Sequence, residues 1–225
     1  MHGRQPVAVA FDLHGVLIDW DPRYLYRRLF ADPADMEDFL ARIATADWYR
    51  EHDLGADIAG SCRRLARRHP AHREMIMAWA ERGEEMVAGQ FDQTVQVLAE
   101  LKAAGIRCYA LSNMEPDALV ARRARFPFME SFDGYVISGM ERVAKPDRRI
   151  FEILLRRYGL EPRATVFVDD VAQNVEAARA LNMYAVQYVS ARRLRQQLRS
   201  LGLTELRPPR APGQRPDPGP GQLPA

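Results

Sequence analysis

Short apolar runs recur along the chain, and each ends at polar residues or at a glycine. Their length and their content of β-branched residues are typical of buried strands. Amphipathic stretches with helical spacing alternate with the later runs. This alternation predicts an α/β fold in which helices cover both faces of a parallel sheet. The expected strands lie at residues 7–11, 106–111, 135–138, 165–168 and 184–189, and the expected helices at 94–103, 150–158 and 172–181.

A different pattern follows the first strand. Its spacing is helical and amphipathic, and proline or glycine divides it into stretches at 34–46, 56–68 and 71–87. Because no strand-like run interrupts this region, we expect an all-helical cap inserted after the first strand. The predicted division is an α/β core of residues 1–19 and 90–204 and a cap of residues 20–89.

The C-terminal residues 205–225 differ in composition from the rest of the chain. Seven of the fifteen prolines and three glycines fall there. A segment of this composition buries little apolar surface, so we expect a disordered tail.

The overall composition narrows the possible classes of function. The chain has 225 residues, of which 47% are hydrophobic and 28% charged, and its net charge is +2. So small a net charge gives no electrostatic reason to expect nucleic acid as a partner. No apolar run approaches the length that spans a membrane. We therefore expect neither nucleic acid nor membrane as a partner, and a monomer or a weak homodimer.

The two cysteines bear on the cellular compartment. Cys62 lies in a helical stretch and Cys108 inside an apolar strand, so we expect two reduced thiols rather than a disulfide. No long apolar signal segment opens the sequence. Both observations predict a cytoplasmic protein.

Polar side chains stand where three of the predicted strands end. Asp12 follows the first strand, Ser112 and Asn113 follow the second, and Asp169 and Asp170 follow the fourth. The carboxyl ends of parallel strands meet at one edge, where open α/β sheets bind their ligands. We therefore expect these side chains to lie together.

Lys145, in a loop just before Pro146, is expected at the same crevice. Carboxylates gathered in one place repel one another unless a cation neutralises them. Oxygen ligands of high charge density suit a hard ion, so we expect Mg²⁺ as the cofactor.

The residues around these positions form four ordered motifs. They are 11–17 (FDLHGVL), 111–113 (LSN), 145–146 (KP) and 168–170 (VDD) with Asn174. In this order they resemble the haloacid dehalogenase-like (HAD) hydrolase superfamily, in the subgroup with a helical cap. The sequence around these motifs is also similar to that of bacterial α-D-glucose-1-phosphate phosphatase-like proteins. This resemblance implies a Rossmann-like core and hydrolysis of a small phosphorylated substrate, with a sugar phosphate favoured.

The resemblance also implies roles for individual residues. Asp12 would attack phosphorus in line and give an aspartyl-phosphate, which water then cleaves. The metal ion would be held by Asp12, by the backbone carbonyl of His14 and by Asp170. Asp169 would touch the ion directly or through water.

The remaining motif residues would handle the phosphoryl group, and one position departs from the family pattern. Ser112 and the amide of Asn113 would bind phosphoryl oxygens, and Lys145 would neutralise charge during transfer. Most phosphatases of the superfamily carry a general acid and base, an Asp, where this chain has His14. His14 either takes that acid/base role or only presents its carbonyl. In the second case, activated leaving groups such as anomeric phosphates are favoured.

Two other functions compete with the phosphatase. In a 2-haloacid dehalogenase, Asp12 would attack carbon without a metal, and Arg42 or Arg50 would hold the substrate carboxylate. The adjacent carboxylates of Asp169 and Asp170 suit that reaction poorly. A non-catalytic ligand-binding protein with this fold is the other alternative, because a fold alone does not determine function.

Four further residues carry structural expectations. Trp20, where the chain enters the cap, is expected to pack in the core or the hinge because the spacing there is amphipathic. Trp79 is expected to pack between helices of the cap. His52 is expected at the surface. Asn174 is expected to donate a hydrogen bond that steadies the acidic loop.

Overall fold

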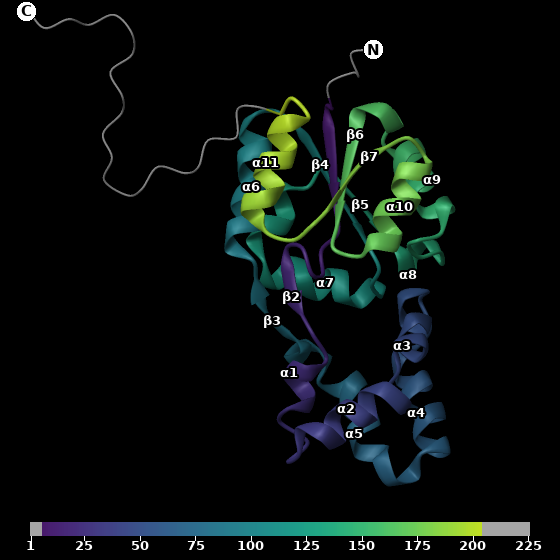
Figure 1. The fold of residues 1–225 in the computed structure, drawn as a ribbon. Helices are drawn as coiled ribbons and strands as arrows, with labels where there is room; N and C mark the ends of the chain where they lie inside the picture. Colours follow the sequence, from purple (N-terminus) through teal and green to yellow (C-terminus); the bar gives the residue numbers. More distant parts are fainter. Residues whose placement is uncertain (1–5, 204–225) are drawn as a thin grey trace, which may run out of the picture.

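A computed structural model of the chain describes residues 6–203 (Figure 1). Within this range five strands form one parallel sheet with the order β5-β4-β1-β6-β7. The strands are β1 (Ala8–Phe11), β4 (Arg107–Ser112), β5 (Gly134–Ile137), β6 (Thr165–Asp169) and β7 (Tyr184–Gln187). The predicted parallel, Rossmann-like sheet is therefore confirmed. The tail predicted for residues 205–225 lies outside the described residues.

Helices cover both faces of this sheet. They are α6 (Asp92–Ala103), α7 (Pro116–Arg125), α9 (Arg148–Arg157), α10 (Ala172–Ala180) and α11 (Ala191–Ser200), and the short α8 (Ser138–Glu141) follows β5. Successive side chains of a strand point to opposite faces. Accordingly, Val9 and Phe11 join the apolar core that includes residues of α6, α7 and α11, whereas Ala8 and Ala10 join the core beneath α9 and α10. Figure 1 shows α6 and α11 on one side of the sheet and α9 and α10 on the other.

A second group of helices lies beyond the carboxyl ends of the strands (Figure 1). It comprises α1 (Arg23–Tyr26), α2 (Pro33–Arg42), α3 (Ala46–Asp53), α4 (Ile58–Arg68) and α5 (Arg73–Glu81). These helices share an apolar core of their own, around Tyr26, Phe39 and Ile76. Side-chain caps begin three of them, since Asp32, Thr45 and Asp57 accept hydrogen bonds from the first turns of α2, α3 and α4.

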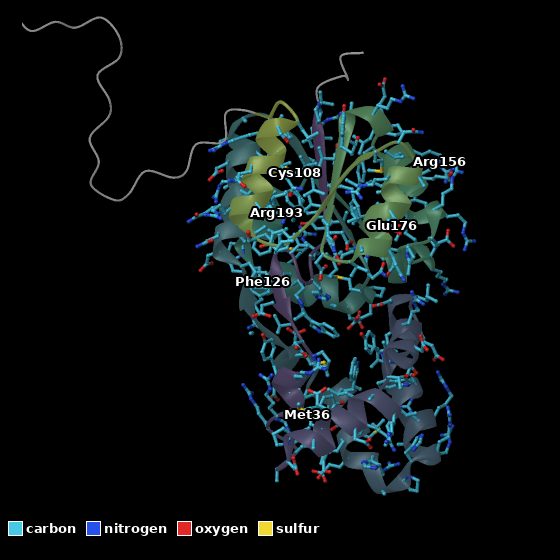
Figure 2. All side chains as sticks on the ribbon, viewed as in Figure 1. Met36, Cys108, Phe126, Arg156, Glu176 and Arg193 are labelled. Atoms are coloured by element: carbon cyan, nitrogen blue, oxygen red, sulfur yellow. The ribbon has the colours of Figure 1, made fainter. Side chains whose placement is uncertain are left out.

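The two cysteines lie in different cores. Cys62 is buried among the helices that follow β2, and Cys108 is buried in β4. Figure 2 labels Cys108 in the part of the molecule that holds the sheet and Met36 in the helical group. The prediction of two free thiols is confirmed.

The region after the first strand is not purely helical, so that expectation was wrong. The helix predicted for 71–87 ends at Glu81, and β3 (Val87–Gln90) pairs antiparallel with β2 (Ile18–Trp20). Strand pairing between segments so far apart in sequence replaces the end of the predicted helix, where Gly83 is a poor helix former. The chain enters and leaves the helical group through this β2–β3 pair, and the division at residues 20 and 89 stays a prediction.

Candidate active site

The carboxyl edge of the sheet gathers the predicted acidic residues. Asp12 directly follows β1, Asp169 ends β6, and Asp170 comes next in the chain. One carboxylate oxygen from each of the three lies within 4.8 Å of the others. Asp12 and Asp169 are buried, and Asp170 is exposed at the cleft.

Lys145 lies at the centre of this acidic group. Its Nζ is 2.9 Å from Oδ2 of Asp12 and 2.7 Å from Oδ2 of Asp169, and the lysine side chain is fully buried. Burial alone would lower the pKa of Lys145, but the two carboxylates raise it more, so the net shift is upward. The ammonium group therefore stays charged and links the two aspartates.

Ser112, at the end of β4, and Asn113, which follows it, hold Asp12 and Lys145 in place. The Ser112 hydroxyl donates to Oδ1 of Asp12 at 2.8 Å, and the backbone N–H of Leu13 donates to the same oxygen at 2.7 Å. The Asn113 side chain bonds the Lys145 backbone twice, donating to its carbonyl at 3.0 Å and accepting from its N–H at 2.9 Å. The side-chain amide of Asn113 is therefore engaged in positioning Lys145.

Asn174 steadies the acidic loop, as predicted. Its side-chain amide lies 3.1 Å from both carboxylate oxygens of Asp169, and the backbone N–H of Val171 donates to Oδ1 at 2.8 Å. Asn174 reaches this position because it lies one turn into α10. These bonds fix the orientation of the Asp169 carboxylate.

The donor set fits a hard divalent cation. Three carboxylates supply oxygen ligands of the kind that Mg²⁺ prefers. Gly15 makes room for one of them: with φ of +76°, it lies so close to Asp170 that a Cβ there would come within 2.5 Å of Oδ2. The backbone turn after β1 is thus shaped around the Asp170 carboxylate.

The His14 side chain stacks on Trp20. The two rings are 5.4 Å apart between centroids and 15° from parallel. Within the described residues its Nε2 is buried without a hydrogen-bond partner. Burial, with help from Arg122 and Lys145, lowers the pKa of His14 to about 3. The imidazole is therefore neutral at physiological pH.

A cavity of about 1030 Å³ lies over the site, between the sheet edge and the helical group. Asp12, His14, Asn113, Lys145 and Asp170 line it from the sheet side. Ser112 and Asp169, which bond Asp12 and Lys145, are completely buried beneath it.

Aromatic rings form much of the opposite wall. Tyr49 and Trp79 stack at 5.3 Å, and Trp20 meets both rings edge-on. The packing expected for Trp20 and Trp79 is present, but both also line the cavity. His52 is buried against Trp48 and Trp79, so its predicted surface position was wrong. It lies on the inner face of α3, which the sequence pattern did not show.

Several charged residues that line the cavity were not singled out from the sequence, and three of them bear on the site. They are Asp53 at the end of α3, Glu115 before α7, and Arg122 on α7. Arg122 is buried and donates to Glu84 at 2.5 Å, while its Nε has no partner among the described residues. Burial, Glu115 and Asp12 raise the pKa of Asp53 to about 7. No sequence signal separates Asp53 from its polar neighbours, because only helix packing directs it to the cavity.

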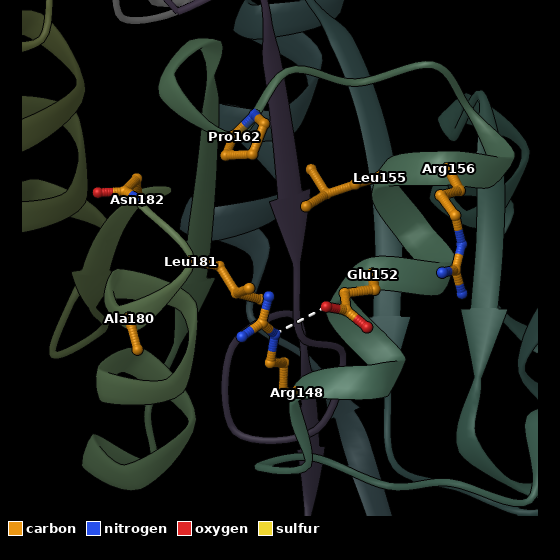
Figure 3. Close-up of a pocket in the computed structure, with 8 residues that line it drawn as sticks. All are labelled: Arg148, Glu152, Leu155, Arg156, Pro162, Ala180, Leu181 and Asn182. Carbon is orange, nitrogen blue, oxygen red and sulfur yellow. Dashed lines mark hydrogen bonds and ion pairs between the residues drawn. The ribbon is translucent and has the colours of Figure 1, made fainter.

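A second, smaller cavity of about 390 Å³ lies between α9 and α10 (Figure 3). Arg148 and Glu152 form an ion pair at 2.7 Å on its wall. It contains none of the residues that the motifs predict, and it lies against helices rather than at the sheet edge. The larger cavity, which the motif residues line, is therefore the candidate active site.

Comparisons with known proteins agree with this geometry. The family model described as haloacid dehalogenase-like hydrolase matches residues 7–182. The chain belongs to this family and is a hydrolase.

Among the described residues, none of the helices is both long and apolar enough to cross a membrane.

Individual relatives differ in activity. The sesquiterpene phosphatase astK of Aspergillus oryzae is 26% identical over 205 residues, covering 86% of this chain and 95% of the relative. An (S)-2-haloacid dehalogenase of Pseudomonas is 30% identical over 89 residues, covering 40% of this chain and 38% of the relative. A HAD family enzyme of Bacteroides thetaiotaomicron, solved with magnesium and inorganic phosphate, has a TM-score of 0.62 at 18% identity, covering 82% of this chain and 94% of that one.

Proposed function

We propose that the protein is a Mg²⁺-dependent phosphomonoesterase that acts on a small phosphorylated metabolite through an aspartyl-phosphate. The observation that carries this proposal is the cluster of Asp12, Asp169 and Asp170 with the buried ammonium of Lys145. Three carboxylates arranged in this way suit a metal-assisted phosphoryl transfer. The phosphatase relative supports the same reaction.

Asp12 is the proposed nucleophile. Its Oδ1 is held by Ser112 and by the Leu13 N–H, and its Oδ2 by Lys145. The carboxylate is therefore oriented before substrate arrives, which is the main protein contribution to phosphoryl transfer. Attack on phosphorus forms the Asp12–phosphoryl bond and releases the leaving group, and water then cleaves that bond.

Three residues are proposed to bind the transferring group. The Ser112 hydroxyl would turn from Oδ1 of Asp12 to a phosphoryl oxygen when substrate binds, because it has only one proton to donate. The amide of Asn113 would bind a second oxygen, and Lys145 would balance the negative charge that collects on them. Because the side-chain amide of Asn113 already bonds the Lys145 backbone, its backbone N–H is the amide we assign to phosphate.

The proposed ligands of Mg²⁺ are Asp12, Asp170 and the backbone carbonyl of His14, with Asp169 directly or through water. When bound, the ion supplies positive charge that stabilises the oxygens of the phosphoryl group. Asn174 and Gly15 set the positions of the Asp169 and Asp170 carboxylates for this purpose.

His14 is assigned its backbone role rather than the acid/base role. A neutral imidazole that is stacked on Trp20 carries only a weakly acidic N–H, so it is a poor proton donor to a leaving group. We propose an anomeric sugar phosphate as the substrate, because its activated leaving group makes the least demand on a proton donor.

A second substrate class is supported by the aromatic wall of the cavity. The rings of Trp20, Tyr49 and Trp79 offer an apolar surface opposite the nucleophile. The name of the sesquiterpene phosphatase relative also points to a terpenoid phosphate. A phosphate ester with an apolar chain is therefore the second candidate.

The other sequence-level alternatives are less well supported. A 2-haloacid carries its own carboxylate, which the acidic cluster would repel without a cation. A non-catalytic binding role does not account for the three contacts that orient the Asp12 carboxylate. We further propose action in the reducing cytoplasm as a monomer or weak homodimer, without nucleic acid or membrane as a partner; the two free thiols support this compartment.

The decisive experiment is hydrolysis of p-nitrophenyl phosphate with and without Mg²⁺, alongside the Asp12→Asn variant. We expect metal-dependent release of phosphate that the variant loses. α-Glucose 1-phosphate and farnesyl phosphate then separate the two substrate classes. Failure of all three esters, together with halide release from 2-chloropropionate, would replace the phosphatase with the dehalogenase.

A further inference from the structure

We infer that Asp53, on the wall of the cavity opposite Asp12, is the general acid and base of the reaction, protonating the leaving-group oxygen and later activating water. This inference rests on the proposed phosphatase function. Asp53 would carry out the proton transfer for which His14 is unsuited. The general acid would then come from the helical group and not from the loop after β1.

The fold seats the end of α3 against the sheet domain. Asp53 is the last residue of α3, and α3 packs against α8. Two residues further on, Gly55 has φ of +83°, and a Cβ there would lie 2.5 Å from the carbonyl oxygen of Gly139 in α8. The backbone next to Asp53 therefore lies against the sheet domain, which carries Asp12. Asp53 also lines the same cavity as Asp12.

The Asp53 carboxyl makes no hydrogen bond or ion pair among the described residues, unlike Asp12 and Asp169. Four charged groups act on it electrostatically: Arg50 on α3, Glu115 before α7, Asp12 after β1, and Lys145 before α9. The acid on α8, Glu141, is paired with Arg157.

The balance of these neighbours favours the protonated carboxyl. Burial raises the pKa of Asp53, Glu115 and Asp12 add to the rise, and Lys145 and Arg50 oppose it, which leaves the pKa at about 7. A group of this pKa holds its proton for donation and releases it readily near neutral pH, as a general acid and base must.

Glu115 is the nearest rival for this role. Burial raises its pKa as well, but the charges that act on it are those of Arg122, Glu84 and Asp117. Asp53 instead responds to Asp12 and Lys145, which are site residues. We therefore assign the role to Asp53 and use Glu115 as the control.

The proton balance closes over two steps. In the first, an Asp12 oxygen bonds to phosphorus, the bond from phosphorus to the leaving oxygen breaks, and the Asp53 carboxyl gives its proton to that oxygen. In the second, the Asp53 carboxylate takes a proton from water as the water oxygen attacks phosphorus. The bond to Asp12 then breaks, phosphate leaves, and Asp53 is protonated again.

The test compares three esters of similar shape: p-nitrophenyl, phenyl and benzyl phosphate. The benzyl alkoxide needs a proton most and p-nitrophenolate least. With Mg²⁺ present, we expect Asp53→Asn to lower kcat/KM for benzyl phosphate by about 100-fold or more and for p-nitrophenyl phosphate by less than about 3-fold. Hydrolysis of the nitrophenyl ester also shows that the variant is folded.

The pH profile gives a second readout. For benzyl phosphate, kcat/KM of the unaltered protein should fall above pH 7, and Asp53→Asn should lack this decline. Glu115→Gln should keep the preference among the esters and move the decline to lower pH, because it removes a negative charge beside Asp53.

Other results would count against Asp53. An equal loss for all three esters, or no loss for any, overturns the acid/base role while metal-dependent, Asp12-dependent hydrolysis upholds the phosphatase. If the unaltered protein hydrolyses none of the esters, or Asp12→Asn keeps its rates, the phosphatase function and the role of Asp53 fall together.

Discussion

Lys145 and Asp169 form an ion pair of 2.7 Å in which neither side chain is exposed to solvent. Asp12 accepts a second contact from the same ammonium group at 2.9 Å. Removing one partner of a buried pair leaves an uncompensated charge, which is strongly destabilising. Lys145 therefore stabilises the site as well as serving the proposed reaction.

Lys145→Met tests this dependence. We expect the free energy of unfolding to fall by about 3–5 kcal/mol, because two carboxylates lose their shared cation. Added Mg²⁺ should restore part of the loss, and a chelator should remove that gain. Urea unfolding at neutral pH, with and without the metal, measures both effects.

The matched control is Lys102→Met. Lys102 forms a similarly short pair with Asp133, 2.6 Å, but both side chains are about a third exposed. Such pairs contribute about 0–1 kcal/mol. Equal losses in the two variants would contradict a special role for the buried pair.

The sheet side of the site was predictable because it follows from topology. The carboxyl ends of parallel strands must meet, so Asp12 and Asp169 come together wherever the strands are recognised. Asn174 was predictable for a similar reason, since one helical turn brings it back to the acidic loop.

The cap side was not predictable in the same way. Trp79 and Asp53 reach the cavity only through the packing of α3 and α5, and helix periodicity does not encode the angle of that packing. The β2–β3 pair depends on contacts between segments about seventy residues apart, which a local pattern does not reveal.

Gly15→Ala tests the close approach of the turn to Asp170. The new Cβ would meet Oδ2 at 2.5 Å, in a backbone conformation with φ of +76° that disfavours side chains. We expect a loss of about 1–2 kcal/mol from the backbone alone. Displacement of Asp170 should also weaken Mg²⁺ binding, which isothermal titration calorimetry measures.

Gly105→Ala separates these two effects. Gly105 has nearly the same φ, +74°, but a Cβ there meets nothing within 4 Å. We expect a similar loss of stability with Mg²⁺ affinity unchanged. If both variants bind the metal as tightly as the unaltered protein, Gly15 has no part in shaping the site.

Asn174→Ala tests the support of the acidic loop. The Asn174 amide holds both oxygens of Asp169 at 3.1 Å, so its loss frees that carboxylate to turn. Removing such a partner typically costs 10–100-fold in metal affinity, and we expect about this loss in the Mg²⁺ dependence of hydrolysis. Gln187→Ala, which removes an exposed bond to the Asp170 carbonyl, should change it little.

Asp53 is expected to make the stability of the fold depend on pH. Burial, Glu115 and Asp12 raise its pKa from 3.8 to about 7 in the folded protein. In the unfolded chain Asp53 ionises near 3.8, so between that pH and about 7 the folded state binds more protons. The free energy of unfolding therefore falls as the pH rises through this window, and the loss is complete above it.

Asp53→Asn should remove this slope, because the amide does not ionise. The full difference in pKa corresponds to about 4 kcal/mol, and solvent in the cavity reduces the expected gain at pH 8 to about 1–2 kcal/mol. Urea unfolding of the metal-free protein at pH 4, 6 and 8 measures it as the difference between variant and unaltered protein. Asp47→Asn, at an exposed position on the same helix, is the control variant. A difference that does not change with pH for Asp53→Asn would show that the Asp53 carboxyl ionises as easily in the folded protein as in the unfolded chain.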